Sequence, residues 1–308
     1  MVAALSKILP DDFGGRFSAW WNGNEYTPPE PDADGAEDGA ETSADEGAAP
    51  VQMDPAASRI AALETLWGEG RFSPGSSELY SRITEGMSAF EGGADRRFGV
   101  LNGDPALTQH FMGISGVCPV IAEWRAPCAD RFREVFSDFD VVRGDIDRPA
   151  FEPGSLSLLV SQDGFTYADH KSGLAVRALR SLEPGGQWVV IDTVRGNAKG
   201  ALAPAFASSW AEPQLCEQDE IEDVADAAGF EVSSSVDDIS GDVIQACRSA
   251  FERFGQDLEN RLASRLEGVN KQIFVRELAW EAGAWKWRQR ALAGELIHTK
   301  VWKFRKPT

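Results

Sequence analysis

From about residue 56 to its end, the chain alternates short apolar runs with longer segments whose hydrophobic residues recur every three or four positions. The longer segments have the spacing of amphipathic helices, and the short runs have the character of buried strands. The segment 56–67 is a clear case, with Ile60, Leu63, Leu66 and Trp67 on one helical face. The pattern predicts helices at 56–67, 77–87, 104–114, 126–136, 172–182, 217–228, 241–266 and 269–292, and strands at 97–101, 119–124, 140–143, 157–162, 187–193, 230–234 and 296–304.

The order of these elements predicts the fold class. Strands that alternate with helices of this length form a mostly parallel sheet covered on both faces, so we expect a doubly wound α/β domain. Gly229 stands where a C-cap glycine belongs, at the end of a helix. The alternating segment 300–306 predicts a half-buried strand at the edge of the sheet, where lysines discourage further pairing.

Two segments before residue 56 have a different composition. Residues 1–26 are a short aromatic segment that contains the pair Trp20 and Trp21. Residues 27–55 consist mostly of Pro, Ala, Gly, Asp and Glu. The second segment buries too little apolar surface to order itself, so we expect a disordered acidic linker before a domain at 56–308. Trp20 and Trp21 either dock on the chain's own domain or bind a protein partner.

The net charge of -19 argues against two classes of partner. Nucleic acid and anionic membrane surfaces are both held by clustered Lys and Arg, so we expect the chain to bind neither. No run of about 18 apolar residues and no secretory signal pattern is present, which favours a cytoplasmic protein.

The four cysteines, Cys118, Cys128, Cys216 and Cys247, are scattered, with no C-x-x-C pair and no His at ligand spacing. We therefore expect no disulfide framework and no metal site, and we expect these residues to be buried reduced thiols.

Candidate chemistry begins at the turn after the first strand, Asn102-Gly103-Asp104-Pro105. In nucleotide-type folds such a turn approaches the ligand at the carboxyl ends of the strands, and several glycines allow that approach. Here Gly103 stands almost alone, and Pro105 has no N–H to donate. A dehydrogenase on a related sheet is disfavoured because no Gly-x-Gly-x-x-Gly follows the strand.

Four local sequences resemble class I S-adenosylmethionine-dependent methyltransferases. The segment 153–165 resembles the fourth-strand region of that family, and 177–192, with its Leu-Glu-Pro-Gly-Gly turn between a helix and a strand, resembles the segment that follows. The segment 227–232 resembles the next helix-to-strand corner. The segment 63–75 is similar to the corresponding part of small-molecule N-methyltransferases of the glycine-betaine and phosphoethanolamine types. The resemblance covers 56–308. It implies a Rossmann-like sheet of seven strands with the last strand antiparallel, and S-adenosylmethionine as cofactor.

The resemblance also implies which residues hold the methyl donor. Glu123, about 20 residues past the loop, would accept the ribose hydroxyls, and Asp145 would accept the adenine amine, because a carboxylate accepts two hydrogen bonds. The implied cofactor-binding residues are Asn102, Gly103, Asp104, Glu123, Asp145, Ile146 and Gln162.

Candidate substrate residues follow the fourth strand: Asp163, Tyr167 and His170. The alternative is a solvated loop, in which His170 belongs to the polar start of a helix. No catalytic base is evident, and an amine nucleophile needs none. The aromatic residues Trp280 and Trp285 fall on a long helix, where they form either core or a lid over a substrate.

Two functions remain open from the sequence. The first is a methyltransferase that acts on a small molecule. The second is an inactive methyltransferase fold that serves as an interaction scaffold through its aromatic N-terminal segment. A fold cannot choose between them, because one fold hosts many functions.

Overall fold

The computed structural model describes residues 55–85, 87, 97–209, 215–232, 236–256 and 271–308. The predictions for the aromatic segment with Trp20 and Trp21, and for the acidic linker up to residue 54, lie outside the described residues. The domain boundaries therefore stay predictions.

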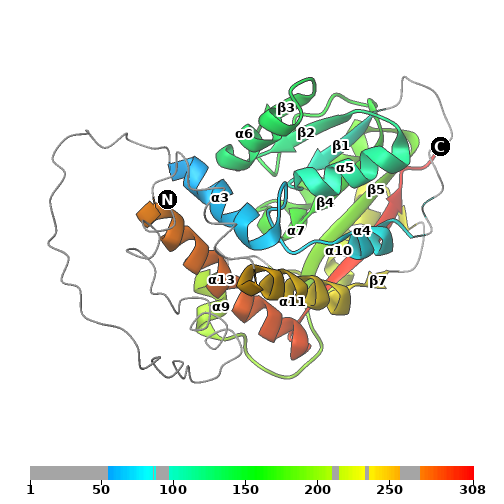
Figure 1. Ribbon diagram of the computed structural model, residues 1–308. Helices are drawn as coiled ribbons and strands as arrows, with labels where there is room; N and C mark the ends of the chain where they lie inside the picture. Colours follow the sequence, from blue (N-terminus) through cyan, green and yellow to red (C-terminus); the bar gives the residue numbers. More distant parts are fainter. Residues whose placement is uncertain (1–54, 86, 88–96, 210–214, 233–235, 257–270) are drawn as a thin grey trace, which may run out of the picture.

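One sheet organises the described chain (Figure 1). Its strand order is β3-β2-β1-β4-β5-β8-β6, with β7 also paired to β8. Strands β1 to β5 run parallel, and β8 runs antiparallel to β5. The strands are β1 (Phe98–Leu101), β2 (Pro119–Glu123), β3 (Asp140–Arg143), β4 (Leu156–Gln162), β5 (Leu182–Arg195), β6 (Glu231–Val232), β7 (Asp237–Asp238) and β8 (Ile297–Arg305).

This arrangement confirms the predicted α/β class and the antiparallel last strand. The described sheet has eight strands where seven were expected, because the two-residue β7 adds to β8. The Pro-Gly-Gly turn lies within the bounds of β5. There it forms an irregularity, since Leu156 pairs with Leu182 but Leu158 already pairs with Gln187. Gly185, with φ of 77°, supplies the left-handed residue of this bulge.

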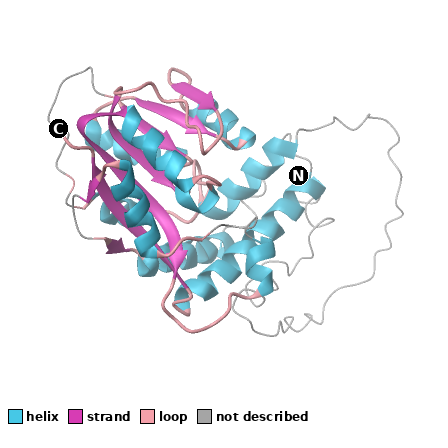
Figure 2. Cartoon of the chain, turned by 180° about the vertical axis from the view of Figure 1, so that it is seen from behind, coloured by secondary structure: helices cyan, strands magenta, loops and turns pink. Residues whose placement is uncertain are grey.

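Helices cover both faces of the sheet (Figures 1 and 2). Helices α3, α4, α5, α6, α11 and α13 contribute to the apolar cluster on one face, and α7, α8 and α10 to that on the other. The helices are α3 (Pro55–Trp67), α4 (Ser77–Thr84), α5 (Pro105–Ser115), α6 (Ala126–Val135), α7 (Gly164–Tyr167), α8 (Lys171–Ser181), α9 (Pro204–Ser209), α10 (Gln218–Ala228), α11 (Ser240–Gln256) and α13 (Lys271–Ala293).

The strand periodicity explains this two-sided core. In β4, Leu158 joins the cluster under α3 and α13, while its neighbour Leu159 joins the cluster under α8 and α10. Strands buried on both faces read as continuous apolar runs, which is why β4 and β5 were predictable. The short helices α7 and α9 were not predicted, because they are too short to show a helical period.

The prediction that the segment 300–306 forms an edge strand is wrong. Strand β8 lies between β5 on one side and β6 and β7 on the other. Lys303 is accordingly only 7% exposed, and its ammonium group donates to the backbone carbonyl of Glu85. Polar residues alternate along β8 because they bind neighbouring segments, and the alternation therefore did not mark an edge.

Other local predictions have mixed outcomes. Gly229 ends α10 in the left-handed conformation, with φ of 102°, as expected of a C-cap glycine. All four cysteines are free, but Cys118 is exposed, so the expectation of four buried thiols is wrong for that residue. Among the described residues, no helix is long and apolar enough to cross a membrane.

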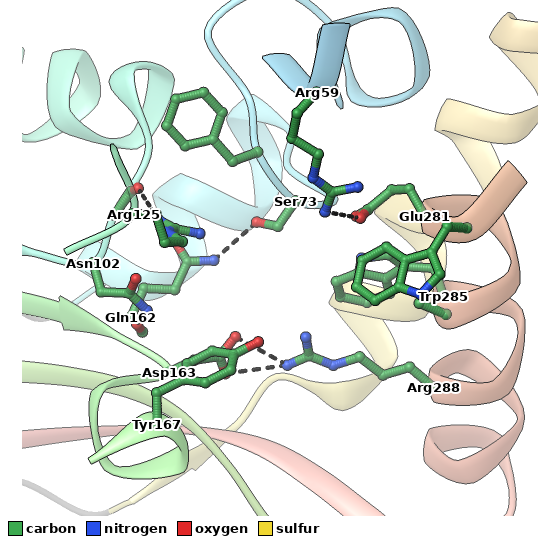
Figure 3. A pocket seen from close by; sticks show the side chains of 14 residues that line it. Arg59, Ser73, Asn102, Arg125, Gln162, Asp163, Tyr167, Glu281, Trp285 and Arg288 are labelled. Carbon is green, nitrogen blue, oxygen red and sulfur yellow. Dashed lines mark hydrogen bonds and ion pairs between the residues drawn. The ribbon is translucent and has the colours of Figure 1, made fainter. Parts of the chain in front are cut away.

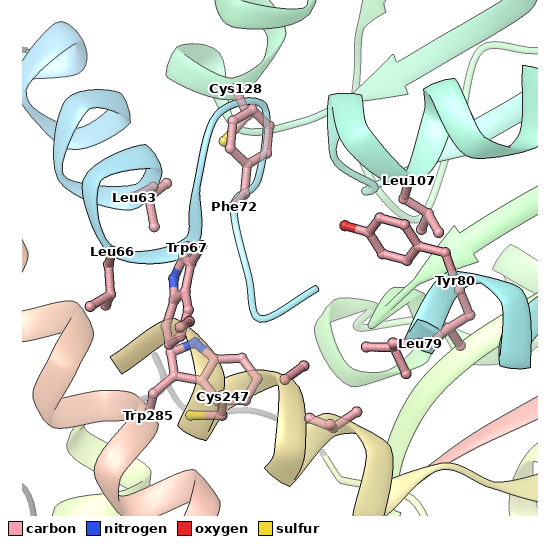
Figure 4. Close-up of a cluster of buried hydrophobic side chains, with 14 of the residues drawn as sticks. Leu63, Leu66, Trp67, Phe72, Leu79, Tyr80, Leu107, Cys128, Cys247 and Trp285 are labelled. Carbon is pink, nitrogen blue, oxygen red and sulfur yellow. The ribbon is translucent and has the colours of Figure 1, made fainter. Parts of the chain in front are cut away.

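Helix α13 lies against α3 through a contact with an aromatic part (Figure 4) and a polar part (Figure 3). The indole of Trp67 meets Trp285 edge-on, with ring centroids 5.4 Å apart. The carboxylate of Glu281 accepts a hydrogen bond from Trp67 Nε1 at 3.1 Å and one from Arg59 Nη2 at 2.6 Å. This contact holds the C-terminal helix over the carboxyl edge of the sheet.

We predict that Glu281→Ala destabilises the fold by about 2–4 kcal/mol, because it leaves the Trp67 N–H and the Arg59 guanidinium without their buried acceptor. Glu277→Ala is the matched control. Glu277 lies one helical turn away and also pairs with Arg59, at 3.5 Å, but it is more exposed, so its loss costs below about 1 kcal/mol. Urea unfolding followed by tryptophan fluorescence measures the free energy of unfolding of both variants. Equal effects would contradict a structural role for Glu281.

Candidate functional site

A cavity of about 100 Å³ lies at the carboxyl edge of the sheet, between the ends of β1 and β4 and the helix α13 (Figure 3). This is where open α/β sheets bind ligands. Its sheet side is formed by residues that follow β1, β2 and β4, and its roof by the segment after α3 and by one face of α13.

Asn102 ties the strand ends together at the cavity floor. Its side-chain Nδ2 donates to the Gln162 carbonyl at 2.7 Å, and its Oδ1 accepts from Trp124 Nε1 at 2.9 Å. Gln162 in turn donates from Nε2 to Ser73 Oγ at 2.9 Å. Asn102 has φ of 55°. It therefore supplies the left-handed residue that a glycine would supply in a glycine-rich loop, since Asn tolerates this conformation.

Asp104 closes the N-terminus of α5. Its carboxylate accepts the Leu107 N–H at 2.7 Å, while the Ala106 N–H is bound by the carbonyl of Gly70 at 2.9 Å. The side chain lines a second, smaller cavity next to the first. Burial raises the pKa of Asp104 to about 6, and the hydrogen bond from Leu107 opposes that shift.

Glu123, at the end of β2, is held by the residue that starts the next helix. Its side chain is fully buried. Oε1 accepts the Arg125 backbone N–H and Nε, both at 2.8 Å, and Oε2 accepts Arg125 Nη2 at 2.8 Å. The two charges form a bidentate pair, which is the strongest geometry available to an arginine and a carboxylate.

Asp163 and Asp192 shape the segment after β4. Asp163 has φ of 49°, and its carboxylate accepts from Arg288 Nη2 at 3.1 and 3.2 Å and from Thr193 Oγ1 at 3.2 Å. Asp192 accepts the N–H groups of Phe165 and Thr166, at 2.7 and 3.1 Å, and so fixes the first turn of α7. Burial raises the pKa of Asp192, and the nearby charge of Asp163 adds to that shift.

The roof of the cavity is aromatic and cationic. The guanidinium carbon of Arg59 lies 4.8 Å from the ring centroid of Trp280, and that of Arg288 lies 4.4 Å from the centroid of Trp285. Trp285 is buried, whereas Trp280 is 43% exposed. Both line the cavity, and Trp285 also belongs to the apolar core, as the core alternative states. A lid over a substrate stays a prediction.

The structure brings some of the sequence-predicted residues together at this cavity. Asn102, Gly103, Gln162, Asp163 and Tyr167 line it. Asp104 and Glu123 are buried beside it.

Three predicted residues do not reach the cavity wall. Asp145 is exposed and accepts the N–H of Asp147, and Ile146 belongs to the apolar cluster on the other face of the sheet. His170 has an 83% exposed side chain, with Nδ1 3.8 Å from Asp147. It takes the N-cap position of α8, as the polar helix-start alternative describes.

Sequence reasoning missed the arginines of the site. Arg59 and Arg288 are distant in sequence from the strand ends and reach the cavity only through the packing of α3 and α13. Arg125 could have been predicted from the sequence, since it stands two residues after Glu123 and a guanidinium at that spacing can turn back onto the carboxylate. Ser73 lies in the segment that carried the resemblance.

Comparisons with known proteins give a consistent fold. No protein-family model matches the chain, and no curated protein matches its sequence. Among solved structures, the chain is similar to phosphoethanolamine N-methyltransferase 2 of Haemonchus contortus, solved with phosphomonomethylethanolamine and S-adenosylhomocysteine. The TM-score is 0.65 at 19% identity, over 81% of this chain and 57% of that one. The chain thus spans little more than half the length of that relative.

Two further solved structures have the same architecture. One is geranyl diphosphate C-methyltransferase of Streptomyces coelicolor, with a TM-score of 0.52 and 13% identity over 75% of this chain and 79% of that one. The other is the cyclopropane synthase MmaA2 of Mycobacterium tuberculosis, with a TM-score of 0.59 and 12% identity over 83% of this chain and 100% of that one. The chain has the class I methyltransferase fold. In this methyltransferase fold, the cavity described above lies at the ligand-binding edge of the sheet.

We predict that Asp104→Asn removes a pH dependence of stability. The folded pKa of about 6 exceeds the ordinary value of 3.8, so the folded protein retains a proton that the unfolded chain loses. The contribution of the protonated carboxyl is fully present below about pH 4 and is lost as pH rises to about 6. A shift of two pKa units corresponds to about 3 kcal/mol.

Urea unfolding at several pH values from about 4 to about 7, a range that contains the folded pKa, measures this effect. The free energy of unfolding of the wild type should fall over that range relative to the Asn variant, which keeps an acceptor for the helix N-terminus. Exposed Asp138→Asn is the control and should follow the wild type. Parallel curves for the wild type and Asp104→Asn would contradict the assignment.

Proposed function

We propose that this chain binds S-adenosylmethionine at the carboxyl edge of its sheet and transfers the methyl group to a small molecule. The observation that carries the proposal is the cavity that joins the Asn102 loop and the end of β4 to the aromatic face of α13. The methyltransferase fold supports it. The fold alone does not decide the reaction, since one similar structure is named for a cyclopropane product.

The residues present fit this cofactor in their chemistry. A ribose offers two vicinal hydroxyl donors, and Glu123 offers a buried carboxylate whose two oxygens already accept a two-pronged donor, the guanidinium of Arg125. The Asn102 turn and the end of β4 border the same space. Glu123 would hold the ribose, and Asn102, Gly103 and Gln162 would line the donor between β1 and β4.

S-adenosylmethionine supplies, when bound, a methyl group on a sulfonium that an in-line nucleophile can accept. The chain's own residues provide the positioning. Arg288 and Thr193 hold the Asp163 carboxylate in place, and Asp192 fixes the backbone of α7, from which Tyr167 reaches the cavity. Because the site holds these groups in buried hydrogen bonds, little rearrangement is needed at the wall that faces an acceptor.

The acceptor would lie against α13. Trp280, Trp285 and Tyr167 offer aromatic surface that excludes water from the transfer. Asp163 and Tyr167 remain our candidates for acceptor contacts. His170 would need a movement of the exposed start of α8 to contribute, so we propose no acceptor contact for it.

The proposal extends to the setting of the protein. The net charge of -19 supports a small-molecule substrate over nucleic acid, and we retain the proposal of a cytoplasmic location. A protein partner for Trp20 and Trp21 also remains a proposal, and it concerns residues outside those described.

We predict that calorimetric titration detects binding of S-adenosylmethionine and of S-adenosylhomocysteine to the full chain. Asn102→Gly should weaken both by about tenfold, because glycine keeps the left-handed turn but loses the two amide hydrogen bonds that set the cavity floor. Exposed Asn197→Gly is the matched control and should bind like the wild type. No heat of binding at millimolar ligand would overturn the proposed function.

A further inference from the structure

The ribose side of the proposed donor site is occupied by a side chain of the protein itself. Three nitrogens of Arg125, one from the backbone and two from the guanidinium, bind the Glu123 carboxylate at 2.8 Å. The Glu123 side chain is completely buried, while the Arg125 side chain is 29% exposed and lines the cavity. The carboxylate is therefore reached from the cavity only past the guanidinium.

The same guanidinium also closes the gap to the loop after β1. Its Nη2 donates to the Gly103 carbonyl at 3.2 Å (Figure 3), and its carbon lies 5.7 Å from the ring centroid of Phe72. Arg125 thus spans from the end of β2 to the turn at the end of β1. In a donor complex, the ribose would lie between these two strand ends.

The cavity volume agrees with this occupation. The space of about 100 Å³ is smaller than the roughly 300–1,000 Å³ typical of ligand pockets. A nucleoside needs more room than the cavity offers, and the Arg125 side chain lies between the cavity and the Glu123 carboxylate that would accept a ribose. Glu123 itself does not need to move.

We infer that Arg125 is a built-in competitor for the ribose subsite, displaced by the ligand when Glu123 accepts two hydroxyl groups in its place. This inference rests on the proposed function. A guanidinium fork and a vicinal diol both present two donors to one carboxylate, so one replaces the other without leaving Glu123 unpaired. A ligand with a single donor would leave part of the carboxylate unbound and would displace Arg125 less well.

The competitor also has a defined selectivity. Arginine stays protonated over the working pH range, so a change in the charge of Arg125 itself does not control the exchange. Discrimination instead depends on whether the entering molecule matches both oxygens of Glu123. Arg125 is therefore a specificity-determining residue of the donor site and lowers the affinity of every ligand that enters there.

The test is calorimetric titration of S-adenosylhomocysteine into the full chain. Arg125→Ala should bind about tenfold more tightly than the wild type, because the ligand no longer has to break the ion pair. Arg125→Lys, which retains a point charge but not the fork, should fall between them. The matched control is Arg133→Ala, on the helix that follows Arg125, which removes an ion pair with Asp130 away from the cavity and should leave affinity unchanged.

Thermal unfolding shows whether each variant is folded before titration, and Arg125→Lys keeps the test valid if the alanine variant does not fold. Introducing Glu123→Gln into Arg125→Ala should abolish the gain in affinity. A gain that persists in this double variant would overturn the inference, since it would come from space alone. Wild-type binding without any gain in the Arg125 variants would overturn the inference but leave the proposed function standing. No binding by any protein would overturn both.

Discussion

The carboxamide of Asn102 is the contact on which the geometry of the site depends. It is a donor to the end of β4 and an acceptor for the residue after β2, while its own backbone directly follows β1. The side chain of one residue, whose backbone is in the left-handed conformation, thereby links the ends of three parallel strands. The floor of the cavity is thus held by hydrogen bonds, and entry of a ligand into the proposed donor site depends on displacement of the Arg125 side chain.

The roof is built on a different principle. Helix α13 is held by Glu281 against Arg59 and Trp67, far along the chain from the strands it covers. Its aromatic residues serve both packing and the cavity wall, as Trp285 does by touching Trp67 on one side and lining the pocket on the other. Stability of the helical layer and shape of the site therefore depend on the same contacts.

Sequence reasoning reached the sheet and its edge because local patterns encode them. Buried strands such as β4 and helix ends such as Gly229 are set by neighbouring residues, whereas Asn102, Gly103 and Gln162 were predicted from the family resemblance, which places them at the strand ends. Arg59 and Arg288 could not be placed, because their approach depends on contacts between α3, α13 and the sheet. The position of β8 was also missed, since alternation along a strand reports burial and not which strands lie beside it.

The central position of β8 has a consequence for synthesis on the ribosome. Strand β8 follows every other described strand in the sequence, yet it separates β5 from β6 and gives β7 its only described strand partner. Until it emerges, the outer edge of β5 is unpaired and open to association with other chains. The growing polypeptide therefore carries this exposed edge until β8 has been synthesised and inserts between β5 and β6.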